Sequence, residues 1–274
     1  MQLFVCPLCH APLHRIADAL VCSQRHSFDV AREGYVNLFP AHHRASRSPG
    51  DDERMVAARR AFLDAGHFAP LVRPLVDALT AAARTPLDNT IDLGCGEGYF
   101  TNALIAVAAH VYGVDVSKAA IRAAAKRYSA LSLAVASSRR LPLATAAFNA
   151  ALAVLAPIDA EVLRVLRDGG VLVRVSPGGD HLRTLRALMY PDVRSHRRAT
   201  LTLAGFEHAG ETRLRFTFDA DRAARSNLLA MTPMLYRSNE TQRSHAAAPA
   251  LLTIEADFWI DVFRKIADHK TPDP

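Results

Sequence analysis

Short apolar segments separated by helical patterns occupy the middle of the chain. One of them runs into Asp92 and is followed by a glycine-rich turn and a helical pattern. A second, 111–114, ends at Asp115. Three further strands are expected at 131–135, 148–155 and 171–175. A turn at 168–170 precedes the last of them. A strand, a tight glycine turn and a helix form the first unit of an α/β sheet, so the sequence predicts an α/β fold.

Helical spacing also marks segments on both sides of the glycine turn. Asp51 or Asp52 can cap a helix that carries Phe62, because their carboxylates can accept the first free N–H groups. Ser117 begins a later helix that ends in basic residues. A helix after Pro70 is expected to lie beside the glycine turn, because four apolar residues recur there at helical spacing: Leu71, Leu75, Val76 and Leu79.

The glycine turn carries the most informative spacing. Gly94, Gly96 and Gly98 form Gly-x-Gly-x-Gly, which differs from the Gly-x-Gly-x-x-Gly of a dinucleotide site. Glycine adopts backbone angles closed to other residues and lets a ligand touch the main chain. Seventeen residues after Gly98, Asp115 ends the next strand, where a carboxylate can accept both hydroxyls of a ribose. The pattern predicts a nucleoside-type cofactor; a structural turn with a solvated aspartate is the alternative.

Three of the four cysteines lie in the first forty residues. Cys6 and Cys9 form a Cys-x2-Cys pair, and Cys22 and His26 form a Cys-x3-His pair twelve residues later. Four such ligands suit tetrahedral zinc and leave no open position for chemistry, so we expect a structural ion. A disulfide would leave one of the three thiols unpaired, and a redox pair would need a thioredoxin-like unit around it.

Residues 27–38 continue this segment with apolar and aromatic side chains. We expect them to pack against the zinc-binding segment. Tyr35 could stack on a base, but core packing is the favoured interpretation. A segment this short buries too little surface to fold alone, so the metal would supply the missing stability.

Length and composition limit the possible classes of protein. The 274 residues are half hydrophobic, enough for one α/β domain and a small appendage. No run approaches the roughly 18 apolar residues of a membrane span. Because Cys6 follows the N-terminus almost at once, we see no secretory segment and expect a cytoplasmic protein. The net charge of +6 permits a nucleic-acid partner, although 29 arginines against 4 lysines could also reflect codon bias.

Two polar segments carry cations that could meet phosphates. Residues 40–52 read as an exposed linker with histidines and arginines. A second basic cluster could equally be a solvated loop: Arg194, His196, Arg197 and Arg198.

Eight motifs occur along the chain in this order: Cys6 to Cys9, Arg25 to Asp29, Glu33 to Leu38, Ala58 to His67, Gly94 to Tyr99, Ala124 to Tyr128, Ser176 to Gly178 with His181 and Leu182, and Met231 to Pro233. In these motifs and their order the chain resembles the 23S ribosomal RNA (guanine-N1)-methyltransferase family, RlmA type. Similarity runs through most of the chain, and the combination of a zinc ribbon, a linker and a cofactor loop is more discriminating than any single motif.

The resemblance implies a class I, Rossmann-like methyltransferase sheet that binds S-adenosylmethionine, with a small N-terminal zinc-ribbon domain. The implied divisions are a zinc-binding RNA-recognition domain at 1–40, a linker with helices at 41–88 and the methyltransferase domain at 89–274. It places eleven residues at the cofactor: Phe68, Asp92, Gly94, Gly96, Glu97, Gly98, Phe100, Thr101, Asp115, Ser137 and His181.

Two of these positions, and a third position at the end of the expected strand 148–155, depart from the family pattern. Phe68 replaces a tyrosine, and Ser137 stands where many class I methyltransferases carry an aspartate near the adenine. Leu155 stands where an aromatic residue often precedes the Ala-Pro pair, so the sequence supports base stacking at this position less strongly. By sequence alone, His181 is as consistent with a helix start as with a ligand contact.

The implied reaction is methylation of guanine N1 in a hairpin loop of 23S rRNA by a homodimer. The protein must orient the nitrogen, exclude water and accept the N1 proton. Asp159 and His181 are the titratable groups to test first. Two alternatives remain: a small-molecule methyltransferase with a structural zinc, and a non-catalytic zinc-containing RNA-binding or assembly protein. The intact Asp92, the glycines and Asp115 argue against the second.

Overall fold

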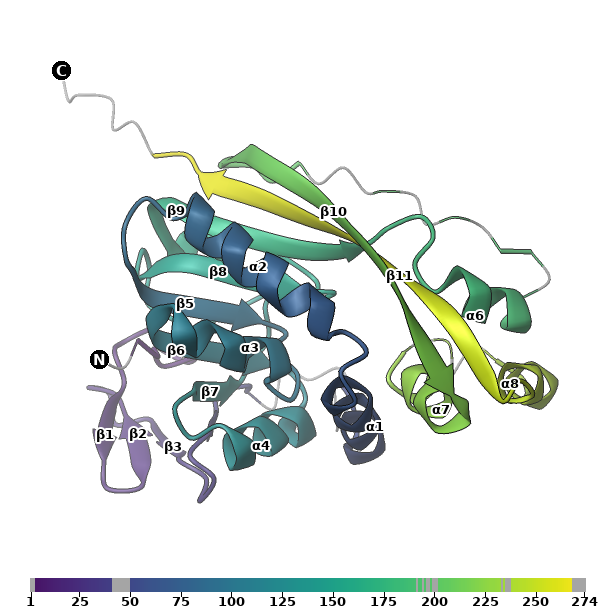
Figure 1. The fold of residues 1–274 in the computed structure, drawn as a ribbon. Coiled ribbons are helices and arrows are strands. Elements are labelled where there is room, and N and C mark those ends of the chain that lie inside the picture. The colour runs from purple at the N-terminus through teal and green to yellow at the C-terminus, as the bar shows by residue number, and fades with distance from the viewer. Residues whose placement is uncertain are drawn as a thin grey trace.

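The computed structural model describes residues 3–40, 50–190, 192–193, 195, 198, 202–232, 234 and 238–267. Its central element is a twisted eight-stranded sheet, with a small three-stranded sheet beside it (Figure 1). The eight strands lie in the order β10-β11-β9-β8-β5-β6-β7-β4. The predicted α/β fold is therefore confirmed.

Five parallel strands form the middle of the large sheet. The first of them in sequence, β5, is central; β6 and β7 extend one side and β8 and β9 the other. The order thus reverses between β5 and β8, which is where open α/β sheets bind ligands. All five predicted strands are present, with these bounds: β5 Leu87–Leu93, β6 Ala108–Asp115, β7 Ser132–Val135, β8 Phe148–Val154 and β9 Leu166–Pro177.

Two local details differ from the expected strand ends. The turn expected at 168–170 is an irregularity inside β9, where Gly169 has φ +73° and the register with β8 shifts. β8 ends at Val154 because Leu155 adopts a left-handed backbone with φ +54°.

The helices begin where their capping residues predict. Asp52, one of the two expected caps, accepts from the Met55 N–H at 2.8 Å, and Ser117 accepts from the Ala120 N–H at 3.0 Å. Helix α2 begins just before Pro70, as expected. The helices are α1 Glu53–Asp64, α2 Ala69–Ala82, α3 Tyr99–Ala103 with the 3₁₀ turn Leu104–Ala106, α4 Lys118–Arg127, α5 Glu161–Val165, α6 Arg183–Met189, α7 Arg222–Ala230 and α8 Glu240–Ala247.

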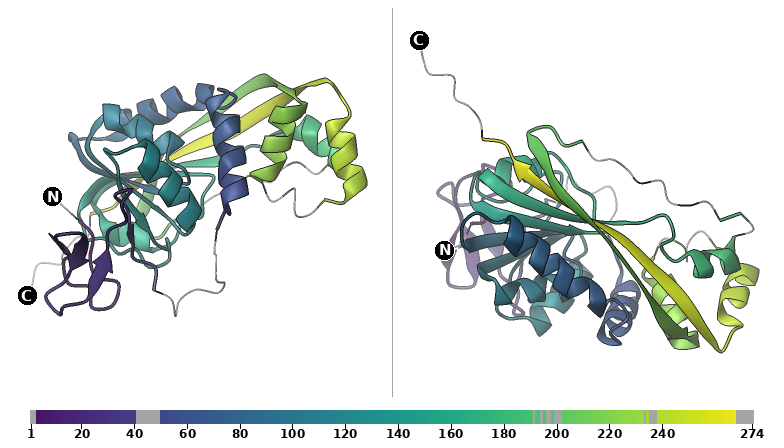
Figure 2. Two further views of the ribbon diagram at one scale, coloured as in Figure 1. Left: turned by 90° about the horizontal axis from the view of Figure 1, so that it is seen from below. Right: turned by 45° about the horizontal axis from the view of Figure 1, so that its top comes forward.

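Different parts of the chain cover the two faces of the sheet. Leu71 and Leu75 of α2 belong to the same buried cluster as Ala150 and Leu152 of β8, and α2 lies across one face of the sheet (Figure 2). The alternate residues of β8 face the other way, into a second core shared with the N-terminal segment and α5. A parallel sheet needs both faces covered, so the zinc-binding segment acts as a covering layer.

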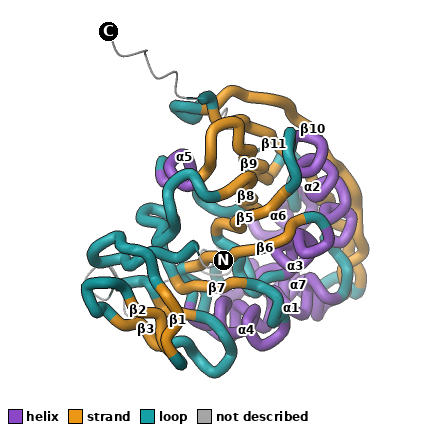
Figure 3. The backbone as a smooth tube through the Cα atoms, turned by 90° about the vertical axis from the view of Figure 1, so that its left-hand side faces the viewer, coloured by secondary structure: helices purple, strands orange, loops and turns teal. Residues whose placement is uncertain are grey.

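The N-terminal segment forms β1 (His14–Ile16), β2 (Ala19–Val21) and β3 (Ser27–Asp29), which make the small sheet beside β7 (Figure 3). Only part of the segment 27–38 stays in that sheet. Its end, β4 (Val36–Asn37), pairs in parallel with β7 and so becomes the edge strand of the large sheet. Tyr35 is buried in the core, as favoured.

The two longest strands were not predicted. β10 (Phe206–Asp221) and β11 (Leu251–Lys265) pair antiparallel along their whole length, and β11 joins the sheet against β9. Their far ends extend beyond the sheet and carry α7 and α8 (Figure 1). Among the described helices, none combines the length and apolar character needed to cross a membrane.

Candidate functional site

The glycine turn directly follows β5 and brings the chain close to the segment after β8. Gly94, Gly96 and Gly98 all have positive φ values, of +71°, +56° and +87°. A Cβ atom on Gly94 would lie 2.6 Å from the Cβ of Ala156. Glycine is therefore required at 94 both by the backbone conformation and by this contact.

A cavity of about 560 Å³ opens at the carboxyl ends of β5, β6 and β8. This is the point where the strand order reverses, and the volume lies within the roughly 300–1,000 Å³ typical of small-molecule sites. Seven of the eleven predicted cofactor residues line it: Phe68, Asp92, Gly94, Gly96, Glu97, Phe100 and Asp115.

Asp115 is held firmly at this cavity. Its Oδ2 accepts from the Gly96 N–H at 3.0 Å and its Oδ1 accepts from the Ser117 N–H at 2.8 Å. Burial raises the pKa of Asp115 above its usual value, and these two N–H groups act against that rise. Each carboxylate oxygen has a second lone pair, so the side chain can still accept the hydroxyls of a ribose.

Asp92 presents an unsatisfied oxygen to the same cavity. It is 2% exposed, and its Oδ2 accepts from the Thr101 hydroxyl at 2.6 Å. Its buried Oδ1 has no hydrogen-bond partner among the described residues. Burial raises the pKa of Asp92 to about 7, opposed by the Thr101 hydroxyl. A buried acceptor without a partner is expensive, so this oxygen fits a ligand that brings a donor, such as an ammonium group.

Two more predicted residues act from behind the cavity. Thr101 does not line it but orients Asp92 through the hydroxyl bond. Gly98 precedes α3 in a left-handed conformation and lets the loop pass close to Tyr128.

Glu97, by contrast, lines the cavity although its side chain is only 1% exposed. Burial raises the pKa of Glu97, and the Arg60 Nε lies 4.0 Å from its Oε2.

Ser137, His181 and Asp159 lie outside the lining of the cavity. The Ser137 hydroxyl accepts from the Arg139 N–H at 3.2 Å, and its neighbours Ala136 and Ser138 line the cavity instead. His181 is buried behind Phe68, with ring centroids 6.1 Å apart, and its Nδ1 accepts from the Asp257 N–H. Their roles in binding or proton transfer remain predictions.

The segment after β8 forms the rim of the cavity. Leu155 lines it, is 47% exposed and has φ +54°, a conformation that a leucine side chain disfavours. Asp159 lies four residues further along the same segment and is half-buried. The strained, exposed leucine is thus presented to solvent at the edge of the cofactor cavity, where a macromolecular substrate can meet it.

Sequence reasoning missed the residues that close the cavity from distant parts of the chain. Asp51, just before α1, and Arg59, in the middle of α1, line it, as do Met231 and Thr232, which directly follow α7. Arg59 forms an ion pair with Asp51 and donates to the Met231 carbonyl at 3.3 Å. The sequence predicts Asp51 only as a possible helix cap. The family-like motifs at 58–67 and 231–233 were the available signal, although Pro233 lies outside the described residues.

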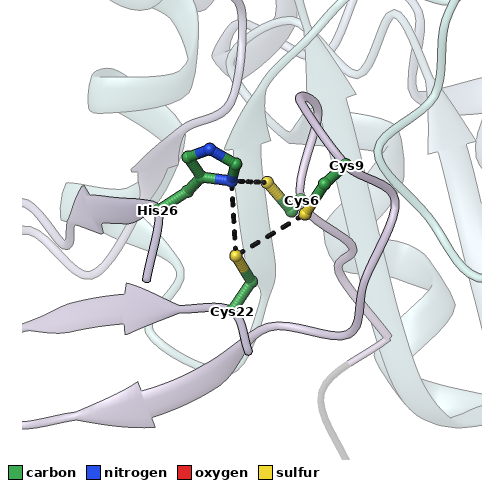
Figure 4. A group of neighbouring side chains, drawn as sticks. All are labelled: Cys6, Cys9, Cys22 and His26. Atoms are coloured by element: carbon green, nitrogen blue, oxygen red, sulfur yellow. Dashed lines mark hydrogen bonds between the residues drawn. The ribbon is translucent and has the colours of Figure 1, made fainter. Parts of the chain in front are cut away.

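The predicted zinc ligands converge in the N-terminal segment (Figure 4). His26 Nδ1 lies 3.5 Å from the sulfurs of Cys6 and Cys22, and the Cys9 and Cys22 sulfurs lie 3.6 Å apart. All four ligand atoms lie within 4.8 Å of one another, and none of the cysteines forms a disulfide.

These separations fit one tetrahedral ion. Sulfurs bound to zinc at about 2.3 Å in a tetrahedron lie roughly 3.8 Å apart, and a sulfur–nitrogen pair lies slightly closer. The set Cys6, Cys9, Cys22 and His26 therefore fits a structural zinc ion. Neither His10 nor His14 belongs to this group.

Of the basic cluster at 194–198, the structure describes only Arg198 among the cationic residues. Arg194, His196 and Arg197 lie outside the described residues. Arg198 binds the carboxylates of Glu211 and Asp261 and stacks 3.9 Å from the Trp259 ring centroid. Those carboxylates with His208 resemble a metal-ligand group. Because Arg198 supplies their counter-charge, we interpret the group as an ion-pair network.

Comparisons with known proteins agree with this geometry. A family model described as RlmA, N-terminal, matches residues 4–47, and one described as a methyltransferase domain matches residues 91–170. A 23S rRNA (guanine(748)-N(1))-methyltransferase from Streptomyces fradiae is 38% identical, with 93% of this chain and 95% of that protein aligned. A Bacillus subtilis (strain 168) relative, whose name also gives guanine N1 of 23S rRNA, is 32% identical over 94% of this chain and 96% of its own.

Among solved structures, the YcgJ protein from Bacillus subtilis is similar at 14% identity and a TM-score of 0.46, covering 71% of this chain and 99% of that one.

Proposed function

Because this chain belongs to the 23S rRNA (guanine-N1)-methyltransferase family, we propose that it methylates N1 of a guanine in a hairpin loop of 23S rRNA. The reaction uses S-adenosylmethionine, whose sulfonium supplies an activated methyl group. The observation that carries the proposal is the glycine-loop cavity, in which Asp115 and the unpaired oxygen of Asp92 face the same space.

The residues of this cavity match the parts of the cofactor. Asp115 would hold the ribose hydroxyls, and Asp92 would accept from the ammonium group. Gly94 and Gly96 let the ligand approach the main chain. Phe68 and Phe100 supply apolar wall on the side of α2 and α3 and help to exclude water.

The target base is proposed to approach over Leu155, at the rim of the cavity. A leucine cannot stack as an aromatic ring does, but its exposed apolar surface can contact the face of a purine. N1 of a paired guanine is inaccessible, so the base must lie in a loop or be flipped out of its helix.

Methylation displaces the N1 proton, which needs an acceptor. Asp159 is our first choice because it belongs to the same rim segment as Leu155 and is half-buried. His181 is the second choice; it would have to act from behind Phe68 or after a rearrangement. Replacing Asp159 by asparagine should lower the rate of methyl transfer, and alkaline pH should restore part of that rate because hydroxide can then take the N1 proton. If Asp159 only positions the base, the variant should stay slower by the same factor at every pH.

Residues 1–40 are proposed to bind the RNA around the target loop. The support is their zinc-fixed geometry together with exposed apolar side chains, Leu8 at 50% and Ile16 at 61%. Exposed apolar groups on a rigid module can contact unstacked bases. The domain divisions at 1–40, 41–88 and 89–274 remain part of this proposal.

A homodimer and a cytoplasmic location are likewise proposals. The homodimer is implied by the family resemblance, and β10 offers an unpaired, largely exposed sheet edge in the described structure. Light scattering on the purified protein would test it. The location follows from a ribosomal RNA substrate.

The decisive experiment is transfer of a labelled methyl group to unmodified 23S rRNA, followed by mapping of the product. Label on guanine N1 within one hairpin loop supports the proposal. Turnover of small molecules without RNA would support a small-molecule methyltransferase. Absence of cofactor binding, measured by calorimetry, would leave a non-catalytic RNA-binding protein.

A further inference from the structure

The cofactor cavity has an uneven distribution of charge. Among the described residues that line it, four are acidic: Asp51, Asp92, Glu97 and Asp115. Arg59 is the single lining residue of the described set with a cationic side chain. Such a cavity favours the positive groups of a ligand and disfavours any carboxylate that does not meet Arg59.

The guanidinium of Arg59 lies directly over the glycine turn. A Cβ atom built on Gly96 would lie 3.6 Å from the Arg59 Nη1, with nothing closer to it. The Arg59 side chain is 25% exposed, so it is shielded but reachable. It therefore faces the same space as the loop whose main chain the cofactor is expected to touch.

Neighbouring residues hold this guanidinium in place. The Asp51 carboxylate binds Nη1, and the Met231 carbonyl accepts from Nη2 at 3.3 Å. Asp51 is itself anchored, since its carbonyl accepts from the Ser117 hydroxyl at 2.5 Å. A guanidinium has five N–H groups in a planar fork, and these described contacts engage only part of them.

S-adenosylmethionine carries an ammonium group, a sulfonium and one carboxylate. The acidic residues suit the two positive groups, but they would repel the carboxylate. We propose that Arg59 binds the α-carboxylate of the cofactor and thereby makes the cavity select donors with a complete amino-acid tail. This inference rests on the family's cofactor and adds a residue that the glycine motif does not reveal.

Two ligands separate this role from general support of the fold. S-adenosylhomocysteine keeps the amino-acid tail, whereas 5′-methylthioadenosine keeps the nucleoside and the sulfur but has no carboxylate. Calorimetry measures both without any RNA or turnover. The variant Arg59→Gln removes the charge, and Arg54→Gln, on an exposed position of the same helix, is the matched control.

Loss of a charge-assisted, forked contact should weaken binding of S-adenosylhomocysteine by roughly 10- to 100-fold in Arg59→Gln. Binding of 5′-methylthioadenosine should change less than about twofold, because that ligand makes no such contact. Arg59→Lys keeps the charge without the fork, so its affinity for S-adenosylhomocysteine should lie between those of the unchanged protein and Arg59→Gln. Arg54→Gln should bind both ligands as the unchanged protein does.

The variant also leaves Asp51 without its partner, which could disturb the fold. The double variant Asp51→Asn, Arg59→Gln removes both charges and should show the same loss for S-adenosylhomocysteine alone. Equal weakening of both ligands, or no weakening of either, would overturn the role of Arg59. Failure of the unchanged protein to bind S-adenosylhomocysteine would instead overturn the cofactor itself.

Discussion

Replacing Asp92 by asparagine should stabilise the ligand-free protein above neutral pH and weaken its binding of the cofactor. The side chain is 2% exposed, and one of its oxygens has no hydrogen-bond partner among the described residues. Burial raises the pKa of Asp92 from the usual 3.8 to about 7. At alkaline pH the folded protein must therefore hold a charge that its surroundings do not satisfy.

The sign and size of the effect follow from proton linkage. Because the folded-state pKa is above the unfolded one, the folded protein binds more protons between about pH 4 and pH 7. Stability contributed by this group thus falls as the pH rises through that window, and the loss is complete above about pH 7. At about 1.36 kcal/mol for each pH unit, the total is on the order of 4 kcal/mol.

Asparagine removes the charge and its amide oxygen can still accept from the Thr101 hydroxyl. Its N–H groups, however, take the position of the unpaired oxygen, which costs roughly 1–3 kcal/mol. We therefore expect Asp92→Asn to be about 1–3 kcal/mol more stable near pH 8 and less stable near pH 5.

Urea unfolding of the ligand-free protein at the two pH values measures this difference. Thr101→Val provides the opposite change: it removes the donor that stabilises the carboxylate, so it should destabilise more at the higher pH. Calorimetry should show weaker binding of S-adenosylhomocysteine by Asp92→Asn. A stability change of the same sign and size at both pH values would refute the reasoning.

Three further perturbations test other parts of the structure. Gly94→Ala should destabilise by roughly 2–3 kcal/mol and abolish cofactor binding, because φ is +71° and the new Cβ would meet Ala156; urea unfolding and calorimetry measure both effects. Cys22→Ser, or zinc removal by a chelator, should lower the melting temperature of the whole chain by roughly 5 °C or more, rather than melting a separate unit; scanning calorimetry distinguishes the two. Leu155→Gly should relieve about 1 kcal/mol of strain yet lower kcat/KM on RNA by roughly tenfold, whereas Ala146→Gly, which relieves a similar strain at φ +51°, should leave RNA methylation unchanged.

The parts of the site that could be predicted are those whose residues lie at fixed, short intervals in the sequence. Gly94, Gly96 and Gly98 are needed by one turn, and Asp115 ends the strand that lies beside it in the sheet. The zinc ligands are two short pairs whose separation is nearly independent of the rest of the chain. In each case the chemistry requires particular residue types at fixed intervals, so the pattern alone carries the information.

Arg59 and Met231 show what local spacing leaves out. They lie 172 positions apart, and both line the cavity only because α1 and α7 pack together. The exposed, charged face of an amphipathic helix looks the same in sequence whether it meets solvent or a ligand. Ser137 shows a second limit: the predicted strand before it is present, but its neighbours Ala136 and Ser138 line the cavity in its place.

The prediction failed at β10 and β11 for a partly different reason. In the second half of β10, Leu214, Phe216, Phe218 and Ala220 alternate with exposed polar residues, which is the period of a half-buried strand, so this half could have been predicted. The first half, from Phe206 to Arg213, has no such alternation. The stability of β10 comes from pairing with β11, whose partner residues lie 59 positions away at the Phe206–Lys265 end and 30 positions away at the Asp221–Leu251 end. The alternation does not identify the partner strand or the full length of the pair, because long-range pairing determines both.

The zinc-binding segment also contacts distant parts of the chain, including the loop beside the cofactor cavity. Phe4 packs against Tyr112 of β6 at a centroid distance of 5.6 Å, and the Val5 N–H donates to the Pro142 carbonyl at 2.9 Å. The loop that receives this bond begins beside Ser138, which lines the cofactor cavity. Metal loss should therefore loosen one wall of that cavity as well as the proposed RNA contact. Weaker binding of S-adenosylhomocysteine by the zinc-free protein, measured without RNA, would separate this coupling from a zinc segment that only recognises RNA.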